Sequence, residues 1–248
     1  METKQLLEDL VVGIIATTDH IPHMCKANEI FGKPIHTVDA IADPEFAKAY
    51  WSLDALAFGS LSSPKFMKMD CVLAGGCSIA LLSKQKEVDP QYLQSIGAQS
   101  LPLVPIAFLD LHKIAEGLFT TSGFGIAPPY QGLGLSKYLI YAATIAAGIE
   151  HLKIPTQLSN VAAHKAWLHL GPLKVVSASL FHDCPDSMLY QAHAPQDPKQ
   201  ILQEPQLQAG EWFEHSKIQG YLASLPSNQS ATLVGYSQTH GQFQVSSR

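Results

Sequence analysis

A glycine-rich turn leads directly into an apolar helix in the middle of this sequence. Residues 127–148 read APPYQGLGLSKYLIYAATIAAG, with Gly132 and Gly134 just ahead of an alanine-rich stretch. Glycine adopts backbone angles that other residues avoid, and the first turn of a helix leaves its amide groups without partners inside the helix. The positive end of the helix dipole lies behind those amides. The stretch therefore predicts a turn whose exposed amides suit an anion.

The segments around this turn alternate between strand-like and helical patterns. Segments 101–111 and 117–129 are rich in Phe, Ile, Leu and Val, as strands are, and the second ends at two prolines. After the helix we expect a short strand at 156–160, opened by Pro155, and a helix from Val161 to Leu170. A helix between two strands permits parallel pairing. The sequence thus predicts an α/β (α+β) fold, in which helices flank a mixed central sheet.

Other segments predict further elements. Residues 1–20 fit one helix, and the Asp-Pro-Glu start at Asp43 predicts a second helix that ends at Phe58. The apolar run 69–82 predicts a strand pair with a turn, or a bulged strand, at Gly75-Gly76. The elements expected after Gly171-Pro172 are strands at 173–181 and 187–193, a helix at 210–224 and a hairpin turning at Thr239-His240-Gly241.

The composition fits one large domain with an appendage. The chain has 248 residues, of which 46% are hydrophobic and 15% are charged, which suffices for a full core. From Ala194 onward the sequence is rich in glutamine and interrupted by prolines. We therefore expect a main domain at 1–194, and a C-terminal extension of helix and hairpin at 195–248 packed on it.

Charge and hydropathy argue against two classes of partner. The net charge is −5 and no Lys/Arg cluster occurs, so a nucleic-acid partner is not expected. The longest apolar run, Tyr138–Ile149, is too short to span a membrane. Glu8 and Asp9 precede the apolar run Leu10–Ala16, where an export signal would carry basic residues. We expect a cytoplasmic protein with no membrane partner.

Cysteine and histidine residues follow no recognised disulfide or metal pattern. The four cysteines are irregularly spaced without a C-x-x-C pair, which predicts free thiols in a reducing compartment. Asp19, His20, His23 and Cys25 carry atoms that bind zinc. However, Pro22 interrupts any helical register, and no second ligand cluster follows. We expect a polar loop there, and no metal.

Common nucleotide and hydrolase motifs do not fit. A P-loop needs a lysine directly after its last glycine, and none stands in that place. A dinucleotide-binding turn needs a third glycine and an acidic residue on the following strand, whereas Glu150 falls at the end of the predicted helix. No G-x-S-x-G motif occurs, and Ser62-Ser63-Pro64-Lys65 lacks the companion motifs of S-x-x-K enzymes.

Two linked motifs do fit a known family. Gln131-Gly132-Leu133-Gly134-Leu135-Ser136, preceded by Ala127-Pro128-Pro129-Tyr130, resembles motif A of the GCN5-related N-acetyltransferases (the GNAT superfamily). Downstream, Asn160, Ala163, Trp167 and Gly171 reproduce the spacing of that family's N-x-x-A-x-x-x-Y-x-x-x-G-F signature. The chain is similar to the family over 100–193, and only in outline before residue 100.

The resemblance implies a site for acyl-coenzyme A. In that family the amides of the turn hold the pyrophosphate, and the pantetheine arm lies between two parallel strands, here those near 118–126 and 156–160. Ser136 replaces the usual Gly or Ala, and its hydroxyl can add a donor. Asn160 is interpreted as a bridge to the cofactor, as a helix N-cap, or as both. The residues implied for this site are Ile126, Gln131, Gly132, Leu133, Gly134, Leu135, Ser136, Asn160 and Trp167.

The implied reaction is transfer of an acetyl (acyl) group from acetyl-CoA to an amine of a small molecule or peptide by direct attack. It needs an aligned amine, a proton acceptor and a donor for the oxyanion. Asp110 and Glu116 are the acids close ahead of the turn, and His164 lies one helical turn after Asn160. These three are the candidate catalytic residues. The alternatives are a surface or hairpin charge for each acid and a solvated helix face for His164; His182-Asp183 is a further pair.

Two departures from the family keep other functions open. Trp167 stands where the family often has a tyrosine that protonates the leaving thiolate, and an indole has no useful acidity. Pro172 replaces an aromatic residue. The alternative is therefore a GNAT-like protein that binds acyl-CoA or another ligand without turnover, as a sensor or interaction module; a third is a scaffold with a fortuitous turn. The sequence does not fix the oligomeric state, so a homodimer also stays open.

Overall fold

The computed structural model of this protein describes residues 6, 8–39, 41–58, 75–178, 187–205, 208–225, 230–237 and 242–247. The chain divides into two compact units. The first comprises Met1–Lys113 with Ser122–Gly148, and the second comprises Ile114–Thr121 with Ile149–Arg248. This division differs from the boundary that composition suggested at residue 194. Within the second unit, strand β12 (Ala231–Ser237) pairs with β9 (Leu173–Ala178), so residues on both sides of 194 share one sheet.

The first unit is built on a mixed sheet. Its described strands run in the order β4-β1-β5-β6-β7. β1 pairs with β4 in parallel and with β5 antiparallel, and β5 pairs antiparallel with β6. The bounds are β1 Val11–Ala16, β4 His36–Asp39, β5 Cys77–Lys84, β6 Leu103–Ala115 and β7 Leu118–Ile126, with a small separate pair of β2 Glu29–Ile30 and β3 Lys33–Pro34.

The prediction of a helix over residues 1–20 is wrong. Val11–Ala16 is strand β1, and Val12 and Ile14–Ala16 are almost fully buried between β4 and β5. A strand that is covered on both faces is apolar throughout, so it lacks the alternation that marks a strand in sequence. The β-branched valines and isoleucines favour this conformation.

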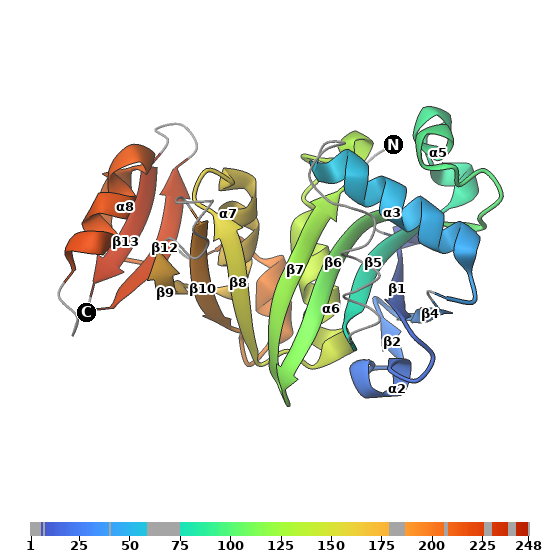
Figure 1. The fold of residues 1–248 in the computed structure, drawn as a ribbon, viewed down its shortest axis with the longest axis horizontal. Coiled ribbons are helices and arrows are strands. Elements are labelled where there is room, and N and C mark those ends of the chain that lie inside the picture. Colours follow the sequence, from blue (N-terminus) through green and yellow to red (C-terminus); the bar gives the residue numbers. More distant parts are fainter. Residues whose placement is uncertain are drawn as a thin grey trace. The chain divides into compact units, whose positions relative to one another are not determined.

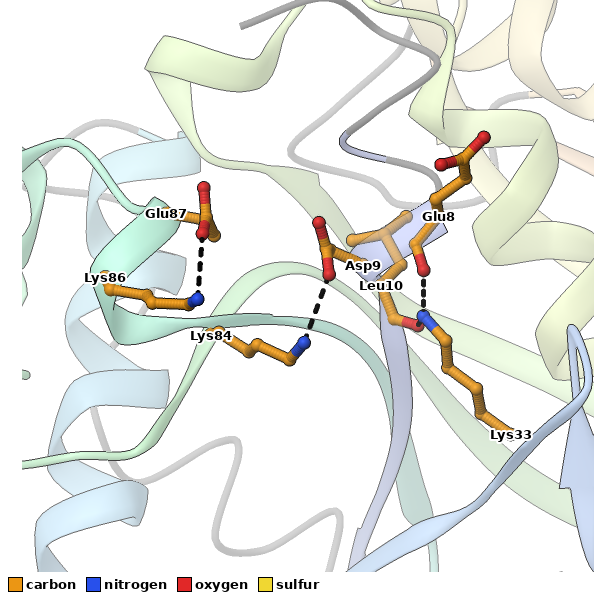
Figure 2. Close-up of polar contacts among 7 residues, drawn as sticks. All are labelled: Glu8, Asp9, Leu10, Lys33, Lys84, Lys86 and Glu87. Atoms are coloured by element: carbon orange, nitrogen blue, oxygen red, sulfur yellow. Dashed lines mark hydrogen bonds and ion pairs between the residues drawn. The ribbon is translucent and has the colours of Figure 1, made fainter.

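The lysines beside β1 add polar contacts at its start. Figure 2 shows the Lys33 Nζ donating to the backbone carbonyls of Glu8 and Leu10, the latter at 2.9 Å. Lys84 at the end of β5 forms an ion pair with Asp9, with 3.1 Å between Nζ and Oδ1. Half of the Lys84 side chain is exposed, and exposed ion pairs contribute less than about 1 kcal/mol. Burial of β1, rather than these contacts, fixes its place.

Helices cover this sheet. Figure 1 shows α3 (Pro44–Phe58) in front of β5 and β6, while α6 (Leu135–Ala147) lies behind them. The helix predicted at 43–58 is confirmed: the amide of Phe46 donates to the Asp43 carboxylate at 3.0 Å, which caps the first turn. The remaining helical segments of this unit are α2 Ile21–Met24, α5 Pro90–Ile96, and the 3₁₀ turns Gln85–Glu87 and Pro128–Tyr130.

The strand expected around Gly75-Gly76 begins only after the two glycines. β5 starts at Cys77, and Gly75 has a left-handed backbone (φ 86°). Residues 69–74 lie outside the described residues, so the strand pair proposed for 69–82 is not tested. The predicted strands at 101–111 and 117–129 are confirmed as β6 and β7, with ends that differ by a few residues.

The second unit contains the start of β7 (residues 118–121), and its strands run in the order β7-β8-β10-β9-β12-β13-β11. β7 and β8 pair in parallel, from Leu118 opposite His151 to Thr120 opposite Lys153. The predicted parallel pair is thereby confirmed, and so is the mixed sheet flanked by helices. The other bounds are β8 His151–Gln157, β10 Ser187–His193, β11 Glu211–Glu214, β13 Gln242–Ser247, α7 Val161–Trp167, α8 His215–Ser224, and the 3₁₀ segments Leu168–Leu170 and Pro198–Leu202.

Two boundaries in this unit were misjudged. β8 begins at His151 rather than at 156, because the buried Leu152 and Ile154 belong to the strand and Pro155 lies within it, opposite Leu189 of β10. The helix expected at 210–224 begins only at His215. Residues Glu211–Glu214 form a strand on β13 instead.

Other predictions in this unit hold. The helix at 161–170 is α7 followed by a 3₁₀ turn, and Gly171 ends it with φ 113°. β9 and β10 pair antiparallel, and β12 and β13 form the terminal hairpin. The hairpin turn at Thr239–Gly241 lies outside the described residues, as do Cys71, Cys184, His182-Asp183 and Ser62–Lys65.

Candidate functional site

The glycine turn is anchored to the core of the first unit at its start. β7 ends at Ile126, and the next amide, that of Ala127, donates to the Ile106 carbonyl of β6 at 2.8 Å. The amide of Tyr130 donates back to the Ala127 carbonyl at 2.8 Å, and the Tyr130 side chain is buried under the turn. Tyr130 therefore packs beneath the turn.

The two glycines need their backbone angles, not extra space. Gly132 and Gly134 have left-handed φ values of 78° and 73°, which other residues adopt at a cost. Apart from the glycine itself and its chain neighbours, no atom of the described residues lies within 4 Å of the position that a Cβ would take at either residue. The Gln131 side chain holds the turn closed, because its Nε2 donates to the Ile126 carbonyl at 3.0 Å. The turn is therefore fixed in shape and open on its outer side.

The amides at the start of α6 have no acceptor inside the described part of the protein. No hydrogen bond from the backbone N–H of any residue from Gly132 to Ser136 occurs there, and no side chain caps the helix at Gly134. The first turn of α6 carries no acidic residue. These amides add their partial charges to the positive end of the helix dipole. The arrangement favours an anion with several oxygens.

Both ends of α6 are held in place. Leu135 and Leu139 are fully buried, which fixes the helix start. At the other end the amide of Lys26 donates to the Ala146 carbonyl at 2.6 Å. The Phe31 ring stacks on Tyr141 with centroids 5.4 Å apart. The helix that presents the open amides is thus a rigid element, braced by residues from the N-terminal part of the same unit.

Asp110 is a buried carboxylate and not a surface charge. Its side chain is 3% exposed on β6, and it accepts a hydrogen bond from the hydroxyl of Tyr50 on α3. The Tyr50 oxygen also bonds the hydroxyl of Ser78 on β5. A Cβ at Gly123 of β7 would overlap the Asp110 carboxylate, so the two strands lie close together at that point. The surface or hairpin alternative for Asp110 is wrong.

Glu116 and His164 have different surroundings. Glu116 is exposed in the turn between β6 and β7. It therefore precedes β7 in the chain, whereas the glycine turn comes after β7. His164 is fully buried, so the solvated helix face expected for it is wrong. Its Nδ1 lies 2.8 Å from the Asn160 carbonyl and its Nε2 lies 3.0 Å from the Tyr190 hydroxyl. A carbonyl only accepts, so Nδ1 carries the proton and Nε2 accepts from Tyr190.

The second motif belongs to the second unit. Asn160 caps α7, because its Oδ1 accepts from the Ala163 amide at 3.1 Å, which confirms the N-cap interpretation. Trp167 is 2% exposed in the core of that unit. The structure therefore gathers Ile126 and Gln131–Ser136 in the first unit and Asn160, His164 and Trp167 in the second.

Sequence reasoning missed Tyr50 and Ser78. Tyr50 lies on a helix that offered no motif, and Ser78 lies in the apolar run that became β5. A serine inside a fully buried strand was the available signal, because a buried hydroxyl needs a partner. The partner comes from α3, which only tertiary structure brings near.

No metal centre is found among the described residues, where no three His, Cys, Asp or Glu side chains gather. His20 bonds Thr17 (Nδ1 to Oγ1, 2.8 Å), and the Cys25 thiol donates to the Ala27 carbonyl at 3.0 Å. The polar loop expected there contains the single-turn helix α2, with Pro22 in its first turn, where proline is tolerated. Among the described helices, none combines the length and apolar character needed to cross a bilayer.

A separate hollow of about 400 Å³ lies in the second unit. Residues Leu168–Pro172 line it, as do Asp197, Gln200, Gln203 and Glu204. Its polar lining consists of carboxylates, side-chain amides and His169, and no lysine or arginine is among the described residues that line it. An anionic carrier is therefore better suited to the open amides of the glycine turn than to this hollow.

Comparisons with known proteins give structural matches only. No protein-family model matches the chain, and no curated protein matches its sequence. An IAA acetyltransferase from Bacillus cereus matches with a TM-score of 0.41 at 16% identity, over 57% of this chain and 90% of that one. An acetyltransferase from Streptococcus agalactiae gives 0.41 at 14%, over 60% and 91%. Diaminobutyrate acetyltransferase EctA from Paenibacillus lautus gives 0.43 at 13%, over 59% and 87%.

Proposed function

We propose that this protein is an acyl-CoA-dependent N-acyltransferase, which moves an acetyl group from acetyl-CoA to an amine of a small molecule or peptide. One observation carries the proposal: among the described residues the amides of Gly132 to Ser136 have no hydrogen-bond acceptor, and they lie at the start of a helix that is held at both ends. A pyrophosphate has the charge and the oxygens that such a turn binds. The motif that contains these residues resembles the pyrophosphate turn of the GNAT superfamily.

Several residues of the turn would bind the pyrophosphate or hold the turn in shape. The amides of Gly132–Ser136 would donate to the pyrophosphate, the Ser136 hydroxyl would add a donor, and Gln131 would keep the turn closed through Ile126. Lys137 in the first turn of α6 supplies a cation near the same end. A cytoplasmic location is part of this proposal, because the four cysteines follow no recognised disulfide pattern.

Asp110 is the proton acceptor that the geometry supports best. The acceptor amine attacks the thioester carbonyl, a C–N bond forms, and the C–S bond breaks so that coenzyme A leaves as the thiolate. The proton of the amine passes to the Asp110 carboxylate, directly or through a water molecule, and solvent protonates the thiolate. Glu116 is exposed in a hairpin turn, and both nitrogens of His164 are bonded in the core of the second unit.

Trp167 favours one other function. An indole has no useful acidity, and this one is buried. A protein that binds acyl-CoA without turnover, as a sensor, would need no acid at that position.

Two measurements test these functions. Coenzyme A should raise the melting temperature, whereas phosphopantetheine, which lacks the pyrophosphate, should raise it much less at the same concentration. Equal effects of the two, or no effect of either, would show the proposed site to be wrong. Release of free thiol from acetyl-CoA with a panel of amines then tests catalysis. Stabilisation by coenzyme A without thiol release from any amine would identify the binding protein instead.

A further inference from the structure

Three buried polar side chains form a chain of hydrogen bonds in the first unit. Ser78 on β5, Tyr50 on α3 and Asp110 on β6 are 0%, 2% and 3% exposed. The Tyr50 hydroxyl lies between the other two side chains and bonds both. The Tyr50 ring also meets the Phe108 ring edge to face, with centroids 5.4 Å apart. The phenol is thereby fixed against the sheet.

The available hydroxyl protons determine the direction of the two hydrogen bonds. Tyr50 has one hydroxyl proton, and it donates that proton to the Asp110 carboxylate. The Ser78 hydroxyl therefore donates to the Tyr50 oxygen. Burial first, and then the negative charge of Asp110, raise the pKa of Tyr50 well above its ordinary value, so the phenol keeps its proton. Asp54, one turn along α3, adds a second negative charge near the phenol.

The strand that leads into the glycine turn passes directly over Asp110. A Cβ at Gly123 would overlap the carboxylate, and one at Gly125 would lie 2.6 Å from the Phe108 ring and 2.8 Å from Ala57. These two glycines let α3, β6 and β7 approach one another closely. Gly123 itself carries no titratable group; Tyr50 bonds Asp110 from α3, and Ser78 bonds Tyr50 from β5.

We propose that Tyr50 is a positioning residue, which together with Ser78 orients the Asp110 carboxylate as the proton acceptor for the amine. This inference rests on the proposed function. A carboxylate that accepts a phenol hydrogen bond is favoured over its protonated form. The second carboxylate oxygen of Asp110, Oδ2, faces Gly123 of β7, the strand that leads into the glycine turn. Loss of the phenol hydroxyl would leave the carboxylate in place but easier to protonate.

The test compares Tyr50→Phe with Tyr92→Phe. Tyr92 is a buried tyrosine of the same unit whose hydroxyl donates to the Pro105 carbonyl at 2.7 Å, away from Asp110, so it controls for the loss of a buried hydroxyl. In Tyr50→Phe the acidic limb of the pH profile of kcat/KM should shift to higher pH by about one unit. The rate should also fall about tenfold, with unchanged affinity for coenzyme A. Ser78→Ala should shift the limb in the same direction by less.

The result that overturns the inference is an acid limb in Tyr50→Phe that coincides with that of Tyr92→Phe. A second readout needs no activity: carbon NMR of labelled aspartate carboxyls, with Asp110→Asn to assign the resonance. The titration midpoint of that resonance should lie higher in Tyr50→Phe than in the wild type, and an unchanged midpoint refutes the role of Tyr50. If the wild type releases no thiol with any amine, the proposed function fails, while this titration still decides the effect of Tyr50.

Discussion

Replacement of Gly134 by alanine separates the fold requirement of the turn from its binding role. Gly134 has φ 73°, and no atom of the described residues beyond its chain neighbours lies within 4 Å of the added Cβ. The substitution therefore destabilises the protein only through the left-handed backbone. That cost is about 1–2 kcal/mol for an alanine. In a chain of this size it lowers the melting temperature by about 2–8 °C. A bound pyrophosphate would meet the new methyl group directly.

Gly97→Ala is the matched control. Gly97 ends α5 with φ 69°, and in the described part of the chain its Cβ position likewise has no atom within 4 Å beyond its chain neighbours. Both variants should therefore lose similar amounts of stability. Only Gly134→Ala should lose affinity for coenzyme A, by tenfold or more, which corresponds to about 1.4 kcal/mol.

Urea unfolding gives the stabilities of the two variants, and titration calorimetry gives their affinities for coenzyme A. The reasoning is refuted if Gly134→Ala binds coenzyme A as tightly as Gly97→Ala does. It is also refuted if both variants lose affinity equally, because the effect would then come from backbone strain rather than from the site.

Two further predictions concern the buried histidine and the buried tyrosines. His164→Ala removes two hydrogen bonds and leaves the Tyr190 hydroxyl without that partner. The free energy of unfolding measured in urea should therefore fall by about 2–5 kcal/mol, with unchanged affinity for coenzyme A. An equally stable variant would contradict the assignment of His164 to the core. Burial raises the pKa of Tyr50, Tyr92 and Tyr190 above the ordinary value of 10, so the folded protein holds these protons more tightly than the unfolded chain. Their stabilising effect is complete below pH 10 and is lost as the pH rises above it; urea midpoints measured from pH 8 to pH 11 should fall only at the alkaline end, and a flat profile would contradict this.

Local chemistry explains what the sequence could predict. The turn before α6 and the end of α7 depend on glycines at positions that need left-handed backbone, and both were located from Gly132, Gly134 and Gly171. The cap of α3 depends on Asp43 and Pro44, which act within one turn. Such features need only neighbours in the chain, so a sequence pattern is sufficient to find them.

Burial explains what the sequence could not predict. β1 was interpreted as part of a helix because a strand covered on both faces shows no alternation. His164 was assigned to solvent, yet Tyr190 and Phe243 surround it, and both come from strands far along the chain. Asp110 has the same explanation, since its partner Tyr50 comes from another element. The environment of these side chains depends on residues from distant parts of the chain, which a local sequence pattern does not predict.

The brace at the far end of α6 determines which shortened versions of this chain remain informative. The part that carries both motifs starts near residue 100, but the amide of Lys26 and the ring of Phe31 hold the helix that the glycine turn opens. A polypeptide cut to the motif-bearing part alone would lose that clamp and β1 with it. If such a truncated polypeptide failed to bind coenzyme A, the loss could come from a loosened α6 rather than from the turn. The affinity of the glycine turn for coenzyme A should therefore be measured on the intact chain.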